Sequence, residues 1–106
     1  MIKIKYHYTD DFRRKGFTIK GHADYAPIGE DIVCAAVTSN SIGLINSLDA
    51  IVKVKFDSVI GQEGFIECLV NEESLNEKTD LLLEHFELTM KSIKKDYPNN
   101  IKILKK

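Results

Sequence analysis

The chain has 106 residues, of which 43% are hydrophobic and 29% are charged. This length suits one domain with a single buried core that needs neither disulfide nor metal, and the composition is that of a soluble globular protein. The formal net charge of −1 gives no overall attraction to nucleic acid. Direct nucleic-acid binding is therefore not expected.

The N-terminus and the two cysteines bear on the cellular compartment. Lysines interrupt the apolar residues of the first six positions, so no signal peptide is predicted, and no stretch is expected to be long enough to span a bilayer. Cys34 and Cys68 are far apart in sequence, which favours reduced thiols over a bridge. We expect a cytoplasmic protein with no membrane partner.

The first twenty residues predict an antiparallel hairpin. Apolar and charged residues alternate over positions 2–8, a polar turn follows at 9–11, and Phe17 and Ile19 repeat the alternation. Residues 21–31 (GHADYAPIGED) then contain two glycines and a proline and show no period. They predict a long loop, and loops of this length in compact domains are often functional.

A helix is predicted from Ile32 to about Asp49. Val33, Val37 and Leu44 lie at helical spacing, and Asp31 stands where an N-cap would be.

Beyond this helix the pattern predicts a second hairpin, made of an alternating segment at 52–57, a turn at 61–64 and an apolar run at 65–70. A capping box is expected at 74–77, ahead of a periodic helix that ends before Pro98.

A last strand at 101–103 completes the order ββαββαβ. We therefore predict a single α+β domain over residues 1–106, with two helices packed against a mixed or antiparallel sheet.

Cys34 and His22 are the candidate chemical groups. Cys34 falls in the first turn of the predicted helix, where backbone amides favour a thiolate and could receive an oxyanion. His22 is the histidine in the loop that leads to this helix, so it is the candidate base. Because a carboxylate near the sulfur would raise the thiol pKa, Asp31 is expected to bond helix amides or His22 instead.

Ordinary structural roles compete with this interpretation. A half-buried cysteine is commonly a small core residue, and a loop histidine is commonly a surface residue. Cys68, in the middle of a predicted strand, is expected to serve packing. The chain has no CxxC and no paired histidines, so neither a metal nor a cofactor is predicted.

Two segments together resemble a known family. Gly21-His22-Ala23, a short loop, and then residues 29–38 (GEDIVCAAVT) are similar to the signature of the ribosomal-processing cysteine protease family, Prp. The resemblance covers essentially the whole chain.

The resemblance implies a homodimeric cysteine endopeptidase with Cys34 as nucleophile and His22 as base. It implies removal of a short N-terminal extension from large-subunit ribosomal protein twenty-seven, by a cut after an aromatic pair. Asp31 matches the acidic residue before the nucleophile, as a possible orienter or helix cap. The substrate loop would comprise Gly21, Tyr25, Ala26, Pro27, Ile28 and Gly29.

Two other functions remain open at this point. A noncatalytic ribosome-binding or assembly module would use distributed lysines to contact phosphates, although ordinary solvated strand faces explain them too. These lysines are Lys3, Lys5, Lys53, Lys55, Lys102, Lys105 and Lys106. A thiol enzyme with a small-molecule substrate is the third possibility.

Overall fold

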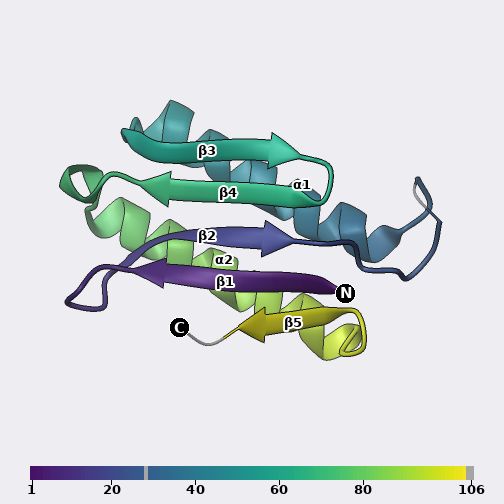
Figure 1. Ribbon diagram of the computed structural model, residues 1–106. Helices are drawn as coiled ribbons and strands as arrows, with labels where there is room; N and C mark the ends of the chain where they lie inside the picture. The colour runs from purple at the N-terminus through teal and green to yellow at the C-terminus, as the bar shows by residue number, and fades with distance from the viewer. Residues whose placement is uncertain (28, 105–106) are drawn as a thin grey trace.

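The computed structural model describes residues 1–27 and 29–104, so Ile28, Lys105 and Lys106 lie outside the described residues. Its elements follow the predicted order ββαββαβ (Figure 1). They are β1 (Ile2–Tyr8), β2 (Arg14–Lys20), α1 (Ile32–Ser47), β3 (Phe56–Gln62), β4 (Phe65–Val70), α2 (Glu77–Asp96) and β5 (Ile101–Leu104).

The five strands form one mixed sheet in the order β3-β4-β2-β1-β5. Neighbouring strands pair antiparallel, except that β5 lies parallel to β1. Both helices lie behind the sheet as drawn in Figure 1, which leaves the other face of the sheet open. The predicted α+β domain with two helices on a mixed sheet is confirmed.

The core lies between the sheet and the two helices. Phe17 of β2 stacks on Phe86 of α2 with ring centroids 4.2 Å apart. Helix α1 contributes Val33, Val37 and Leu44, which recur on one face because of the helical period. Cys68 on β4 is fully buried in this core, so its predicted packing role is confirmed.

The connection after α1 differs from the prediction. Residues Leu48–Val52 form a π-helical turn, and β3 begins only at Phe56. The alternation of Val52, Val54 and Phe56 had predicted a strand there. Tertiary packing overrides it, because Leu48 and Val54 are drawn into the core and the chain must first turn through Lys53, at φ 63°.

The start of α2 also differs. The capping box is formed by Asn76 and Thr79 and not by the segment beginning at Ser74. Asn76 accepts hydrogen bonds from the amides of Lys78 and Thr79, while the Thr79 hydroxyl accepts from the Asn76 amide. Ser74 instead ends a 3-10 turn, and its hydroxyl accepts from the Lys55 amide.

No stretch was expected to be long enough to span a bilayer, and this expectation was wrong. By length and composition alone, the continuous helical segment Ile32–Val52 could cross a bilayer. In the fold, its apolar residues Val33, Val37, Leu44 and Leu48 pack in the core of the domain. Ile32, Ile42 and Ile51 of the same segment are exposed, so core packing accounts for only part of its apolar character.

Candidate active site

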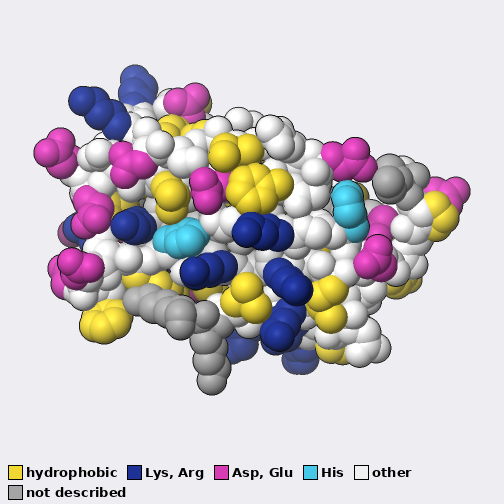
Figure 2. All heavy atoms as spheres, viewed as in Figure 1, with side chains coloured by type: hydrophobic (Ala, Val, Ile, Leu, Met, Phe, Trp, Pro, Cys, Tyr) yellow, Lys and Arg dark blue, Asp and Glu magenta, His cyan; other side chains and the backbone are white. Residues whose placement is uncertain are grey.

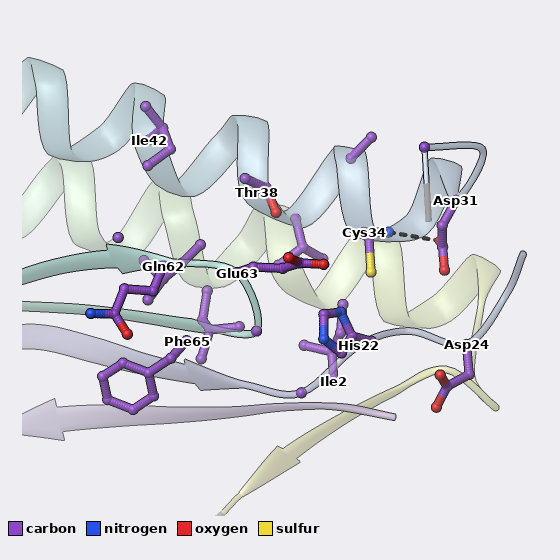
Figure 3. Close-up of a pocket in the computed structure, with 18 of the residues that line it drawn as sticks. Ile2, His22, Asp24, Asp31, Cys34, Thr38, Ile42, Gln62, Glu63 and Phe65 are labelled. Atoms are coloured by element: carbon purple, nitrogen blue, oxygen red, sulfur yellow. Dashed lines mark hydrogen bonds between the residues drawn. The ribbon is translucent and has the colours of Figure 1, made fainter. Parts of the chain in front are cut away.

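A cleft of about 600 Å³ lies where β2 ends, α1 begins and the β3–β4 turn closes (Figure 3). Its lining brings together His22, Cys34 and Asp31 from the predicted site. The remaining walls are mostly apolar, from β1, β2, α1 and β4. These include Ile2, Ile19, Val37, Ile42, Phe65 and Ile66.

Asp31 is the N-cap of α1, and its carboxylate ties the helix to the preceding loop. One oxygen accepts hydrogen bonds from the amides of Val33 and Cys34, at 3.0 and 2.9 Å. The other accepts from the amides of Tyr25 and Ala26, at 3.0 and 3.4 Å. The Asp31 carboxylate thereby fixes Cys34 in the first turn of the helix and also holds the preceding loop through Tyr25 and Ala26.

The expectation that helix-start amides would receive an oxyanion needs correction. The amides of Val33 and Cys34 donate to the Asp31 side chain, and the amide of Ala35 donates to the Asp31 carbonyl. The N–H that reaches the sulfur belongs to Ala23, which donates to Cys34 Sγ at 3.1 Å. The donor beside the Cys34 sulfur therefore comes from the histidine loop.

The pKa of the Cys34 thiol is also raised, whereas its position at the start of a helix predicted that the pKa would be lowered. Burial raises the pKa of Cys34, the Ala23 amide opposes this increase, and the charges of Asp31 and Asp24 add to it. At neutral pH the sulfur is consequently a thiol that needs a base.

The His22 segment is anchored from three other parts of the chain. The Gly21 amide donates to the Gly64 carbonyl at 2.9 Å, and the Asn100 side-chain amide donates to the Ala23 carbonyl at 2.9 Å. The amino group of Met1 donates to the His22 carbonyl. The backbone on both sides of His22 is thus held by the β3–β4 turn, the α2–β5 connection and the start of β1.

The sulfur of Cys34 points toward the side of the cleft where the His22 ring lies (Figure 3). No hydrogen bond joins His22 and Cys34 among the residues that the structure describes. The His22 ring packs against Gly64, where a methyl group in place of the glycine hydrogen would lie 3.1 Å from His22 Nε2. An apo site often tightens its nucleophile–base contact only when substrate is bound.

The predicted substrate loop divides between the cleft and the surface. Gly21, Ala26 and Gly29 line the cleft. Tyr25 instead makes an edge contact with Tyr97, the C-cap residue after α2, with ring centroids 5.4 Å apart, and Pro27 is exposed. Ile28 lies outside the described residues, so its predicted role stays a prediction.

Sequence reasoning missed the wall that faces α1. Residues 61–65, at the β3–β4 turn, line the cleft opposite Thr38 and Ile42. The glycines at 61 and 64 had signalled a turn, but nothing local indicated that this turn meets the loop around His22. Asn100 was missed for the same reason, because it contacts a residue 77 positions away.

Cys34 lies in the first turn of a capped helix, and His22 lines the same apolar cleft. A thiol and a histidine in one cleft are the arrangement that thiol hydrolases use. The family model "Cysteine protease Prp" matches residues 1–102, and the chain therefore belongs to the cysteine protease Prp family. It is a cysteine protease.

Individual relatives agree with this assignment. The ribosomal processing cysteine protease Prp of Bacillus subtilis is 31% identical, over 97% of this chain and 96% of that protein. The corresponding protein of Staphylococcus aureus is 23% identical, with 97% of each chain covered.

Solved structures share the fold. The S. aureus Prp crystal structure with a covalently linked product peptide superposes with a TM-score of 0.89 at 23% identity, covering both chains fully. SMU.848 from Streptococcus mutans superposes with a TM-score of 0.78 at 24% identity, covering 97% of this chain and 91% of that one.

The two cysteines are expected to differ in their reaction with iodoacetamide. The alkylation rate of Cys34 should keep rising from about pH 7 to about pH 9, because a raised pKa leaves the thiolate fraction growing over that range. Cys68 should stay unlabelled in the folded protein, since it is buried and its pKa is raised to about 12. Peptide mapping by mass spectrometry measures both rates. A Cys34 rate that is already level at neutral pH would show that the thiolate forms without help.

Proposed function

We propose that this protease removes a short N-terminal extension from large-subunit ribosomal protein twenty-seven, cutting after an aromatic pair. Cys34 is the nucleophile and His22 is the base in this proposal. The names of the curated relatives support ribosomal processing as the role. The observation that carries the proposal is the apolar cleft, which holds Cys34 and His22 at one end of the sheet.

The apolar walls suit aromatic substrate side chains. Val37 lines the cleft one helical turn beyond Cys34, and Ile42 and Phe65 line its far end (Figure 3); burying an aromatic ring against such walls removes a large apolar area from water. Glu63 and Asp24 add carboxylates to the same lining, and that of Asp24 is paired with the amino group of Met1. Glu63 therefore favours a substrate segment with positive charge near the cleavage site.

The first chemical step makes a thioester. His22 takes the proton of the Cys34 thiol, and the sulfur attacks the scissile carbonyl carbon. The Ala23 N–H, which donates to the sulfur in the resting site, stabilises the negative charge that forms on the sulfur as its proton leaves. The C–N bond then breaks as His22 protonates the leaving amine.

The second step restores the enzyme. His22 deprotonates a water molecule, which attacks the thioester carbonyl; the C–S bond then breaks, His22 returns the proton to the sulfur, and the carboxylate product and the Cys34 thiol are released. Asp31 does not enter either step as a proton carrier in this proposal. It positions Cys34 and the loop through its four amide contacts.

The test is cleavage of the full-length ribosomal protein that carries its extension, read by intact-mass spectrometry. We expect one cut, after the aromatic pair, and none with Cys34→Ala. A matched substrate with the aromatic pair changed to alanines should be cut much more slowly. Failure of the folded, reduced enzyme to cut the extension would leave the protease with another substrate.

Two further parts of the proposal concern assembly and location. We propose a homodimer, and α1 offers an exposed side that includes Ile32, Ser39 and Gly43 for it. Analytical ultracentrifugation at micromolar concentration tests this, and a monomer would contradict it. We also place the protein in the cytoplasm, which cell fractionation can check.

Gly64 is expected to act as a positioning residue for His22. Its φ is 77°, and a methyl group there would lie 3.1 Å from His22 Nε2 and 3.4 Å from Cε1. Gly64→Ala should therefore lower kcat about 10-fold or more while changing KM little, since small displacements of a reacting group are costly.

Controls separate backbone strain from displacement of the ring. Gly61→Ala lies in the same hairpin, and its methyl group would have open space and no contact with the His22 ring; it lines the cleft, so KM can change, but kcat should be retained. Gly64→Asn relieves backbone strain, because Asn tolerates positive φ, yet keeps the contact with His22. If Gly64→Asn recovers the wild-type kcat, strain rather than the ring contact explains the loss.

A further inference from the structure

Three lysines form a row across the open face of the sheet. In the strand register, Lys3 of β1 lies opposite both Lys20 of β2 and Lys102 of β5. All three are exposed, and their chain neighbours Ile2, Ile19 and Ile101 are buried beneath them. Like charges directly opposite on neighbouring strands repel, so the fold carries an unfavourable arrangement here. We call these three residues the lysine row.

The lysine row has no ion-pair partner among the residues that the structure describes. Lys5 adds a further exposed cation on the same face. Glu67 is a carboxylate on the same side; in the strand register it lies level with Thr18 and Lys5 and not with the lysine row, and it accepts hydrogen bonds from the hydroxyls of Thr18 and Ser58. Figure 2 shows the lysines gathered on this face, although the whole chain carries a net charge of −1.

The row ends at an aromatic ring beside the active-site cleft. Lys20 pairs in register with Phe65 of β4, and its Nζ lies 5.7 Å from the Phe65 ring centroid. Phe65 also lines the cleft. From β5 to β4 the row and this ring span about 14 Å, at the usual strand spacing.

We propose that the lysine row and Phe65 bind single-stranded RNA on the open face of the sheet. The lysines contact consecutive phosphates as point charges, and Phe65 stacks a base, which is how sheet surfaces and basic grooves hold single strands. RNA bound along the row lies next to a peptide that enters the cleft, because Phe65 belongs to both surfaces. The proposal does not rest on the peptide cleavage proposed above, although the two surfaces share Phe65.

RNA fits this surface better than an acidic protein or a second copy of the chain. A repeating backbone charge matches a linear row of cations, and the aromatic ring at its end offers a stacking surface that an acidic peptide would not use. A second copy would bring its own lysine row against this one, and the like charges would repel. The low net charge of the whole chain predicted no nucleic-acid binding. The fold nevertheless brings Lys3, Lys20 and Lys102, which are far apart in the sequence, next to one another on one face of the sheet.

The experiment is fluorescence anisotropy with a short labelled single-stranded RNA over a range of salt concentrations. The row variant carries Lys3→Gln, Lys20→Gln and Lys102→Gln. We expect its affinity to fall about 10-fold or more, and the slope of log K against log salt to decrease by about 2, as for three lost phosphate contacts. Phe65→Leu should weaken binding by about 5-fold or more at constant salt slope, because it removes stacking and no charge.

The matched control carries Lys78→Gln, Lys91→Gln and Lys95→Gln, which removes the same charge from exposed positions of α2. It should bind RNA within about 2-fold of the wild type. An equal loss in this control, or no RNA binding by the wild type at physiological salt, would overturn the proposal. So would equal competition by a polyglutamate peptide, or a change of oligomeric state in the row variant. RNA binding is measured without cleavage, so its outcome is independent of the proposed ribosomal substrate.

Discussion

Replacing His22 by Asn is expected to lower kcat for peptide cleavage about 10²- to 10⁴-fold, the usual contribution of a general base. The reason lies in the environment of the sulfur. Burial and two carboxylates raise the pKa of Cys34, so little thiolate exists at neutral pH unless a base removes the proton. KM should change little, because the cleft walls remain in place. Steady-state kinetics on a peptide that spans the cleavage site gives both constants.

The pH dependence of the His22→Asn variant provides a second readout. Its residual kcat should rise with pH as solvent deprotonates Cys34, whereas Cys34→Ala should be inactive throughout. His85→Asn is the matched control, since His85 is exposed on α2 and away from the cleft. A His22→Asn enzyme that keeps most of the wild-type kcat would exclude His22 as the base.

Asp31→Ala is expected to lower the free energy of unfolding by about 1 to 3 kcal/mol and to reduce kcat/KM at least about 10-fold. The variant loses both functions of the carboxylate. It leaves the amides of Val33 and Cys34 uncapped, and it releases the amides of Tyr25 and Ala26. Chemical denaturation and peptide kinetics measure the two effects.

Asp31→Asn separates these functions. Asn is as good an N-cap as Asp, but its amide nitrogen cannot accept from Tyr25 or Ala26, so the loop contact is lost while the helix cap is kept. Removing the negative charge should also speed Cys34 alkylation at neutral pH, because that charge helps to raise the thiol pKa. Equal instability of the Ala and Asn variants would show that the loop contact, and not the cap, provides the stabilisation.

The stability difference should depend on pH in a defined direction. Burial of Asp31 opposes ionisation, but the hydrogen bonds from four amides outweigh it and lower the pKa of this carboxyl group. A lowered pKa in the folded state stabilises the protein above the unfolded value of about 4, and the stabilisation is lost as the pH falls through the folded value. The advantage of wild type over Asp31→Asn should therefore shrink below about pH 4.

Most of the fold could be predicted because its signals are local. The alternation of residues 2–8 and the helical period between Val33 and Leu44 depend on neighbours within a few positions, and Pro98 ends α2 for a steric reason. The prediction failed at Val52 and Val54. Their side chains fit a strand pattern, but Leu48 and Val54 are buried in the core on either side of a π-helical turn that ends at Val52, and local spacing does not encode that turn.

The sequence by itself determined which groups could do the chemistry at this site: Cys34 in the first turn of a helix, Asp31 as its cap, and His22 in the loop before it. Only the tertiary structure decided what surrounds the sulfur. The Asp31 carboxylate accepts hydrogen bonds from the first helix amides, and the Ala23 N–H donates to the sulfur. Gly64 and Asn100 hydrogen-bond the backbone of the loop that carries His22. These contacts join residues up to 77 positions apart, so they exist only once the strands have paired. The lysine row arises in the same way, because cross-strand register and not sequence spacing brings Lys3, Lys20 and Lys102 together.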